Sequence, residues 1–311
     1  MHASTVSFWV LLAVAGCASA SGRAPDPGAR LDGGVNGDGG GGGVGGGDMA
    51  GTVIVPPTDD CSDSAKLVYL LDSDNSLWSF KPNQMDITQS TLTLLGPLKC
   101  ATSLQPNAMA VDRTGVAWIE YVPTDEANTT EDQVYKVDVT TLSCTSTSYH
   151  TGSFGTRYGM GFVADAPMST AETLFVAKGE APYALGKLDT TSLTITTLAT
   201  PNGGPELTGT GDAHLWAFFP DASTPRVSEL DKQTASEGKS YPIPQAVGTE
   251  DGYAFAFWGG DFWVFLKKDT DAATVLYHVR GSDGAVTTWP LAGRWIVGAG
   301  VSTCAPITPI G

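Results

Sequence analysis

The sequence predicts an all-β fold, a five-bladed β-propeller, and two observations carry that prediction. A segment of alternating apolar residues, followed by a polar turn and a strand rich in Thr and Ser, recurs five times. The last apolar residues of the five copies are Phe80, Val137, Leu188, Leu230 and Val279. They are spaced roughly 40–60 positions apart, which is the length of a propeller blade. The second observation is that Val, Phe, Trp and Thr dominate the segments between turns, as β-strands favour.

Each copy lies within a longer unit that reads as four short strands. Gly or Asp stands at the first hairpin turn, where a positive φ is often needed. The strands of the four complete units are expected at 108–111, 116–121, 134–137 and 144–149; at 160–163, 173–177, 185–188 and 193–198; at 206–209, 211–219, 227–230 and 238–243; and at 254–258, 260–265, 275–279 and 285–289.

The fifth unit is split between the two ends of the predicted domain. Residues 295–300 read as an innermost strand with no partners after them, whereas 66–71, 77–80 and 91–94 read as three strands that lack an innermost one. Joining the two parts completes a blade and closes the ring in a one-plus-three arrangement, which leaves no sheet edge exposed. A six-bladed ring is the alternative, and it needs a further unit that the sequence does not show.

The N-terminal segment points to secretion. An apolar run over residues 6–16 ends at Cys17, and it has the length of the apolar part of a signal peptide rather than of a membrane span. The segment Leu12-Ala-Val-Ala-Gly-Cys17 resembles the lipobox of bacterial lipoproteins, which implies that residues 1–17 are a lipoprotein signal and that Cys17 is lipidated. No Lys or Arg precedes the run, so either the charged leader is weak or the chain starts upstream. An ordinary secretory peptide cleaved within 18–20 is the alternative.

Residues 18–60 are expected to form a disordered tether. The segment contains glycine runs at 33–34, 39–43 and 45–47 and almost no large apolar side chains. Such a composition cannot bury enough apolar surface to offset the entropy of ordering its backbone. The predicted propeller then occupies residues 61–306, which is enough for one domain with a substantial core.

The cysteine count supports an oxidising compartment. Lipidation of one of the five cysteines leaves four, an even number. The predicted closure brings Cys61 next to Cys304, and Cys100 lies on the crossover into the blade that contains Cys144. We therefore expect disulfides between Cys61 and Cys304 and between Cys100 and Cys144. The alternative is that some of these thiols remain free.

The net charge and the N-terminal segment together limit the classes of partner that we expect. The formal net charge is −16, from 33 acidic and 17 basic residues, and no cluster of Lys or Arg offsets it. Such a chain repels nucleic-acid phosphates, so we expect no nucleic-acid partner. The membrane is an expected partner through the lipid, and Ala18 after Cys17 resembles an outer-membrane sorting signal. The domain would then face the periplasm or the cell surface, and we expect it to be a monomer.

No constellation of residues points to catalysis, to a metal or to a cofactor. The histidines His150, His214 and His278 lie far apart in the repeat and lack the spacing of zinc ligands. Each of them is expected to be a strand or turn residue. We therefore assign no catalytic residue, no metal ligand and no cofactor.

The acidic residues are mostly expected in turns. Asp138, Asp189 and Asp231 follow the repeated strand and suit turn formation. A glycosidase would need two carboxyl groups at a set separation. Glu206, at the start of an innermost strand, is the acid best placed for such a role, but no second acid stands out beside it.

Aromatic and polar residues on the crossovers between blades remain as candidates for ligand binding. The crossovers and the loops between second and third strands should meet on the face opposite the predicted tether. The candidates there are Tyr158, Glu206, Tyr253, Arg294 and Trp295. Aromatic rings beside charged side chains suit the recognition of a sugar or a peptide. The alternative is that Tyr253 and Trp295 pack between blades.

Two further segments resemble a known group of proteins. Residues 296–306 (Ile-Val-Gly-Ala-Gly-Val-Ser-Thr-Cys-Ala-Pro) and 206–212 (Glu-Leu-Thr-Gly-Thr-Gly-Asp) are similar to myxobacterial lipoproteins with a β-propeller domain. The resemblance implies the fold and a surface location, and it brings no catalytic residues. We expect a membrane-anchored, extracytoplasmic, non-catalytic binding module for a protein or a glycan. The alternatives are a carbohydrate-active or lyase-type enzyme with its site in the central funnel, and a structural surface component.

Overall fold

The computed structural model describes residues 61–310, apart from 126, 129–130 and 222. The predicted signal peptide, the lipidation site at Cys17 and the tether at 18–60 lie outside these residues. In the described part of the chain, no helix has the length and apolar character needed to cross a membrane.

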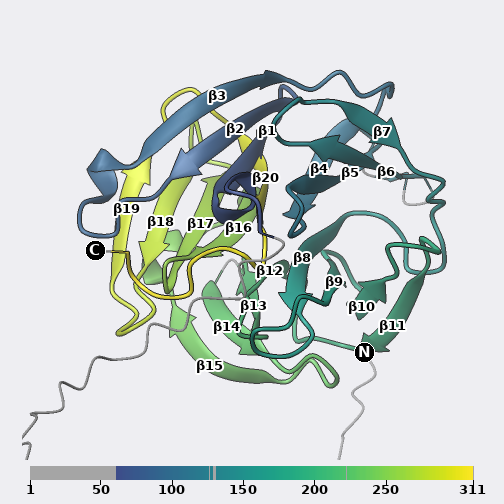
Figure 1. Cartoon of the computed structure of the whole chain (residues 1–311). Helices are drawn as coiled ribbons and strands as arrows, with labels where there is room; N and C mark the ends of the chain where they lie inside the picture. Colours follow the sequence, from purple (N-terminus) through teal and green to yellow (C-terminus); the bar gives the residue numbers. More distant parts are fainter. Residues whose placement is uncertain (1–60, 126, 129–130, 222, 311) are drawn as a thin grey trace, which may run out of the picture. The chain divides into compact units, whose positions relative to one another are not determined.

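Five four-stranded antiparallel sheets form the blades of a propeller, as predicted (Figure 1). Blade 1 comprises β20 (Ile296–Val301), β1 (Val68–Asp72), β2 (Ser76–Lys81) and β3 (Thr91–Pro97). Blade 2 comprises β4 (Gln105–Val111), β5 (Val116–Val122), β6 (Gln133–Asp138) and β7 (Cys144–Ser146). Blade 3 comprises β8 (Tyr158–Ala164), β9 (Glu172–Lys178), β10 (Leu185–Leu188) and β11 (Ile195–Ala199).

The last two blades follow the same order from the centre to the rim. Blade 4 comprises β12 (Glu206–Gly209), β13 (Leu215–Phe219), β14 (Arg226–Leu230) and β15 (Glu237–Pro242). Blade 5 comprises β16 (Glu250–Trp258), β17 (Asp261–Lys268), β18 (Val275–Val279) and β19 (Val286–Pro290). Three 3₁₀ turns complete the described secondary structure: η1 (Ser64–Lys66), η2 (Ile87–Gln89) and η3 (Pro244–Ala246).

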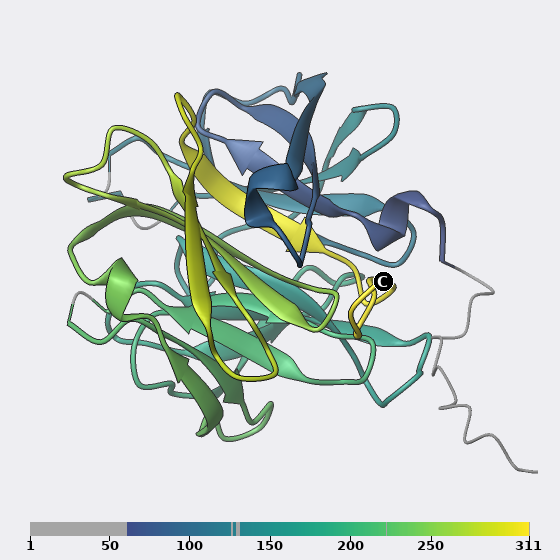
Figure 2. The same cartoon turned by 90° about the vertical axis from the view of Figure 1, so that its left-hand side faces the viewer.

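The ring closes as predicted, with one strand from the C-terminal end and three from the N-terminal end. The C-terminal β20 pairs antiparallel with β1, and Val301 lies opposite Val68. A disulfide between Cys61 and Cys304 joins the two chain segments that lead away from this pair, with 5.8 Å between their Cα atoms. The C-terminal segment and η1 lie on the same side of the ring (Figure 2). Five blades with a one-plus-three closure are therefore confirmed.

The second predicted disulfide is also present. Cys100, on the crossover into blade 2, is bonded to Cys144, at the start of the outermost strand of that blade, and their Cα atoms lie 5.1 Å apart. The Tyr121 hydroxyl beside this bond donates a hydrogen bond of 2.7 Å to Asn75 of blade 1. The disulfide thus joins the crossover to blade 2, and the hydrogen bond joins blade 2 to blade 1. Two disulfides indicate a domain that folds outside the cytoplasm.

Several strand boundaries differ from the sequence prediction by one to four residues, and the start of β13 is among the largest differences. A strand was expected over 211–219, but β13 begins only at Leu215. Residues 210–214 form a turn in which the Thr210 hydroxyl accepts the amide of His214 at 3.0 Å and Ala213 has φ +72°. The apolar run Leu215–Phe219 was correctly recognised, whereas the polar residues before it satisfy one another locally and do not join the sheet.

The repeated segment is a real structural repeat, because its turns have the same geometry in successive blades. The Asp138 carboxylate accepts the amides of Thr140 and Thr141 at 2.9 and 2.8 Å, and the same two bonds recur at Asp189 and Asp231. These three aspartates form turns, as predicted. The hydrogen bonds, from the Thr140 hydroxyl first, lower the pKa of Asp138 to about 2.

The innermost strands approach one another closely at the axis. A Cβ atom added at Gly159 of β8 would lie 2.7 Å from the Glu206 Cα in β12, which is closer than Cβ atoms come to backbone. Glycine is needed at this position because it allows the two backbones to meet. Between neighbouring blades, aromatic side chains fill the space; Phe80 of β2, for example, packs edge-on against Trp263 and Phe265 of blade 5 at 5.5 Å.

Candidate functional site

The two faces of the ring carry different loops. The first-hairpin face has the turns between first and second strands and between third and fourth strands, together with the Cys61–Cys304 closure. The crossover face has the loops between second and third strands and the crossovers from one blade to the next. Both cavities described below are lined by residues from the crossover face.

The smaller cavity, which we term the Tyr253 pocket, has a volume of about 240 Å³ and lies among blades 3, 4 and 5. Its walls come from loops that the crossover face brings together. Its lining residues are Gly179, Tyr183, Asn202, Gly203, Gly204, Phe219, Pro220, Asp221, Arg226, Glu250 and Tyr253. Tyr183 exposes 37% of its surface, and Tyr253 is half-buried. The pocket thus offers two phenol rings next to charged and amide groups.

Glu206 does not line the pocket. Its side chain is buried, and its Oε1 accepts a hydrogen bond of 3.1 Å from the amide of Met160 in blade 3. Burial raises the pKa of Glu206 to about 8. Burial and, next, the charge of Glu206 raise the pKa of Tyr253 well above its usual range. The predicted ligand residue Glu206 therefore serves the contact between blades.

One cation of the Tyr253 pocket is held in a fixed position. The guanidinium of Arg226 donates to both carboxylate oxygens of Glu237, at 2.7 and 2.6 Å. It also lies 4.2 Å from the centre of the Phe219 ring. This bidentate pair holds the pKa of Glu237 below its usual range. Arg226 therefore presents charge to the pocket without freedom to reorient.

Tyr158 belongs to a different group of side chains. It is fully buried, and its ring packs edge-on against Tyr149, with the ring centres 6.5 Å apart. Next to it, Glu120 of β5 accepts the amides of Arg157 and Tyr158 at 2.9 and 3.2 Å. Burial, and then the charge of Asp132, raise the pKa of Glu120 well above its usual range. Two carboxyl groups and two phenols are thus gathered between blades 2 and 3.

This group borders the larger cavity, which we term the Asp132 cavity. It has a volume of about 450 Å³ and is formed by β6, the end of β7 and the crossover that follows. Its lining residues are Glu131, Asp132, Gln133, Val134, Tyr135, Ser146, Thr147, Tyr149, His150 and Thr151. Burial raises the pKa of Asp132. The lining is polar and contains no lysine or arginine.

Arg294 and Trp295, the last two predicted ligand residues, lie at the junction of blades 1 and 5. The Arg294 guanidinium is 4.4 Å from the centre of the Trp78 ring. Trp295 is 38% exposed, and Lys267 of β17 lies 4.9 Å from its ring centre. A Cβ atom at Gly252 would lie 2.3 Å from the indole nitrogen of Trp295, so this ring rests on β16. The five predicted residues therefore do not line one pocket. Tyr253 is the one of the five that lines the Tyr253 pocket. Tyr158 and Glu206 are buried between blades, and Arg294 and Trp295 lie at the junction of blades 1 and 5.

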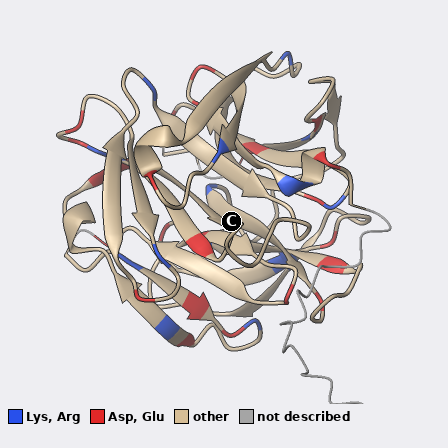
Figure 3. Cartoon of the chain, turned by 60° about the vertical axis from the view of Figure 1, so that its left-hand side comes forward, with Lys and Arg blue, Asp and Glu red and all other residues tan. Residues whose placement is uncertain are grey.

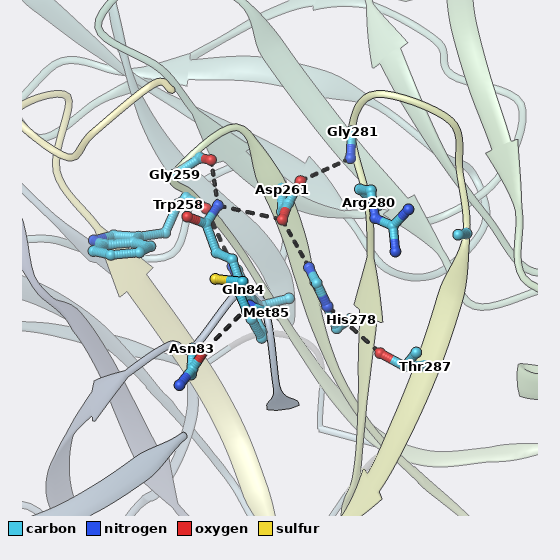
Figure 4. A network of polar contacts seen from close by, with 12 residues as sticks. Asn83, Gln84, Met85, Trp258, Gly259, Asp261, His278, Arg280, Gly281 and Thr287 are labelled. Atoms are coloured by element: carbon cyan, nitrogen blue, oxygen red, sulfur yellow. Dashed lines mark hydrogen bonds and ion pairs between the residues drawn. The ribbon is translucent and has the colours of Figure 1, made fainter. Parts of the chain in front are cut away.

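His278 takes part in a polar network on the first-hairpin face (Figure 4). Its Nε2 lies 2.8 Å from Oδ2 of Asp261, and its ring stacks on Trp263, with the ring centres 4.2 Å apart. Asp261 also accepts the amide of Gly281 at 2.9 Å and the side-chain amide of Gln84 from blade 1 at 3.2 Å. Both side chains are buried. The His–Asp pair therefore contributes to the contact between blades 5 and 1, and the Thr287 hydroxyl lies 3.4 Å from the other ring nitrogen of His278, Nδ1.

The other histidines do not assemble a site either. His214 is exposed and pairs with Glu229, and His150 lines the Asp132 cavity. Among the residues that the structure describes, no three His, Cys, Asp or Glu side chains are placed to hold a metal ion. Lys and Arg are dispersed over the five blades (Figure 3).

Sequence reasoning missed the buried acids Glu120 and Asp132 and the half-buried acid Glu172. Glu172 accepts the amide of Arg113 and the hydroxyl of Thr303 at 2.9 and 2.7 Å on the first-hairpin face, and burial raises its pKa to about 7. The signal for Glu120 was present, because it is the one acid within the apolar strand Val116–Val122. An acid in the middle of such a strand predicts a buried polar contact.

Comparisons with known proteins show that this chain is similar to others in structure only. No family model and no curated protein matches the chain. TolB from Acinetobacter baumannii is 9% identical, with a TM-score of 0.40; the likeness covers 75% of this chain and 56% of TolB. Hydrazine synthase from Kuenenia stuttgartiensis is 14% identical, with a TM-score of 0.41 and coverage of 80% and 72%. Regucalcin from Agrobacterium tumefaciens, described as a calcium-binding protein, is 15% identical, with a TM-score of 0.41 and coverage of 74% and 76%. The propeller assignment rests on the strand topology of this chain.

Proposed function

We propose that the protein is an extracytoplasmic binding module, anchored to the membrane through Cys17, that binds a sugar unit of a glycan in the Tyr253 pocket. The composition of that pocket carries the proposal. Two tyrosines stand beside the Asn202 amide, the Glu250 carboxylate and the fixed Arg226 guanidinium. The volume of about 240 Å³ lies below the range of sites for drug-sized ligands and suits one sugar ring.

The chemistry of a sugar ring matches this arrangement. A pyranose has an apolar face of C–H groups and an edge of hydroxyls that both donate and accept hydrogen bonds. The exposed ring of Tyr183 offers an apolar surface for the first, with a hydroxyl at its end. The side chains of Asn202 and Glu250 offer a donor and acceptors for the second. The exposed positions of Tyr183, Asn202 and Glu250 support access from solvent.

The positions of the buried acids support binding without catalysis. A retaining or inverting glycosidase needs two carboxyl groups facing one substrate. The Glu206 carboxylate accepts the Met160 amide, and Glu120 accepts the amides of Arg157 and Tyr158. Both acids therefore have structural partners. One observation favours the enzymatic alternative: Glu206, with its pKa raised to about 8, would be protonated at neutral pH and could act as a general acid.

Anchoring is supported by the N-terminal pattern and by the cysteines. The lipobox-like segment ends at Cys17, and the other four cysteines form two disulfides. Cys17 is thus the one cysteine left for a lipid. Cys61, where the described chain begins, lies at the first-hairpin closure. A tether that arrives there would leave the crossover face, and with it the Tyr253 pocket, free for a partner.

The test is a glycan array probed with the full chain and with two variants. Tyr183→Ala removes the exposed ring of the Tyr253 pocket, and Trp295→Ala removes an exposed ring at the junction of blades 1 and 5. Leu94→Ala, at a 52% exposed position on β3, is the matched surface control. We expect Tyr183→Ala to abolish the array signals that Trp295→Ala and Leu94→Ala retain. Loss with Trp295→Ala alone would contradict the assignment to the Tyr253 pocket, and no signal from the intact chain would contradict glycan binding.

Turnover distinguishes the enzymatic alternative. Each glycan that binds is incubated with the full chain and with Glu206→Gln, and the products are followed by mass spectrometry. The proposal predicts no cleavage by either protein. Cleavage by the intact chain that is lost in Glu206→Gln would show that the site is catalytic.

A further inference from the structure

The Asp132 cavity contains buried polar atoms without partners. Within the described chain, no hydrogen bond reaches Oδ2 of Asp132, Oε1 of Gln133 or the hydroxyl of Tyr149. Asp132 and Tyr149 are only 4% and 5% exposed, and all three residues line the cavity. Buried polar atoms are nearly always paired in native proteins, so a group of unpaired atoms around one cavity points to a bound partner.

The unpaired atoms form a set of acceptors. When Asp132 is ionised, its Oδ2 is an acceptor and not a donor. Oε1 of Gln133 is likewise an acceptor, and the Tyr149 oxygen can accept a hydrogen bond as well as donate one. Asp132 keeps its position through its other oxygen, Oδ1, which accepts the Thr151 hydroxyl. Glu120 lies close enough for the two acids to affect each other's protonation. Burial raises the pKa of Asp132. The Glu120 carboxyl group and the Tyr149 and Tyr158 hydroxyls lie near Asp132 and lower this pKa, but none of them makes a hydrogen bond to Oδ2.

The charge around the cavity selects a cation. Glu131, Asp132 and the neighbouring Glu120 are acidic, and the lining contains no lysine or arginine. Arg157, on the crossover into blade 3, donates instead to the carbonyl of Pro123 at 2.6 Å. Aromatic rings favour a cation at their faces, and Tyr135 and Tyr149 are part of the lining. The described residues lack a group of three His, Cys, Asp or Glu side chains placed to hold a metal ion, and the aromatic rings and neutral acceptors of the lining suit an organic cation.

We propose that the Asp132 cavity binds the primary ammonium group of a small organic amine, with Asp132 as the charged acceptor and Gln133 and Tyr149 as neutral acceptors. A primary ammonium group has three N–H donors, and the cavity has three unpaired acceptors. The volume of about 450 Å³ leaves room for a carbon chain or ring attached to the nitrogen. The site is separate from the Tyr253 pocket, so either assignment can fail without the other.

Binding should be linked to proton release. Burial raises the pKa of Asp132, and burial together with the charge of Asp132 raises the pKa of Glu120. An ammonium group favours the ionised carboxylates and displaces a proton held by the pair. Tyr149 and Tyr158, with raised pKa values, keep their protons, and Glu131 and His150 complete the titratable groups at the cavity. Affinity for an amine should therefore rise as the pH is raised through the range in which this carboxyl pair ionises.

The test is calorimetric titration of the full chain with n-butylamine, and with 1-butanol as an uncharged match. We expect butylamine to bind, 1-butanol not to bind, and the heat to change with the ionisation enthalpy of the buffer. Asp132→Asn should weaken butylamine binding by roughly tenfold or more, and Tyr149→Phe by about threefold to tenfold. Asp74→Asn, an identical change at an exposed position of blade 1, should leave the affinity unchanged.

Stability separates a binding role from a structural one. Because Asp132 is a buried carboxylate with an unpaired oxygen, Asp132→Asn should keep or raise the melting temperature while it loses the amine. Three results would overturn the proposal: no binding of butylamine, equal binding of 1-butanol, or a melting temperature lowered by Asp132→Asn with the affinity intact. Complete competition by potassium chloride at the same concentration would also overturn it, because the site would then belong to an inorganic cation.

Discussion

Oε1 of Glu206 accepts a hydrogen bond of 3.1 Å from the amide of Met160 in the neighbouring blade. The same kind of bond recurs around the ring: Thr208 accepts the amide of Phe257 at 3.2 Å, and Thr274 accepts that of Ile296 at 2.9 Å. Innermost strands pair with a strand on only one side, so their remaining amides need partners. Polar side chains from the adjacent blade supply them. These contacts explain how buried polar residues hold the blades together.

The first prediction concerns Glu206 and pH. Its pKa is about 8 in the folded protein against 4.5 as the reference value, so the folded state keeps a proton that the unfolded state loses. The free energy of unfolding of the wild type should therefore fall, relative to Glu206→Gln, as the pH rises from about 4.5 to about 8, by about 1.4 kcal/mol per unit at most. Urea unfolding of both proteins at pH 5, 6.5 and 8 measures this difference. A difference that does not change with pH would contradict the account.

The second prediction concerns the two disulfides. Cys61–Cys304 closes a loop of 243 residues and Cys100–Cys144 one of 44. Since the entropy lost by the unfolded chain grows with the length of the closed loop, the longer one should stabilise more, within a range of about 2–5 kcal/mol. Urea unfolding of the double serine variants Cys61→Ser/Cys304→Ser and Cys100→Ser/Cys144→Ser compares them. A larger loss for the second pair would show that the closure is held mainly by strand pairing.

The third prediction concerns the network in Figure 4. His278→Ala removes the stacking on Trp263 and leaves the buried Asp261 carboxylate without its imidazole partner. The loss of stability should be about 2–4 kcal/mol. His214→Ala removes an imidazole that also pairs with a carboxylate, but at an exposed position, and should cost less than about 1 kcal/mol. Thermal unfolding of the two variants makes the comparison, and equal losses would mean that the His278 network does not join the blades.

The strand count, the closure and both disulfides could be predicted because they follow from local patterns. Alternating apolar residues and turn residues mark each strand without reference to its neighbours. Once the unpaired innermost strand expected at 295–300 is recognised, the ring leaves one place for it, beside β1, where β20 lies. The pairing of Cys61 with Cys304 follows from that closure.

The roles of the candidate site residues could not be predicted in the same way. Whether Glu206 faces solvent or a backbone amide depends on how closely β12 approaches β8, which Gly159 permits. The turn at 210–214 was missed because its hydrogen bonds arise between side chains and backbone within a polar segment. No sequence pattern marked Asp132 as a buried residue, because its burial depends on the crossover that packs over it. Contacts between blades are long-range, and a single sequence records only the pattern within each blade.

The most direct test of the central claim is the affinity of the full chain for its best glycan from the array, measured by isothermal titration calorimetry beside Asn202→Ala. Asn202 is exposed and lines the Tyr253 pocket, so its loss should leave the fold intact. We predict that the substitution weakens binding by roughly tenfold, as expected when a site built for hydrogen bonding loses one side chain. An affinity that equals that of the wild type would contradict the assignment of glycan binding to the Tyr253 pocket.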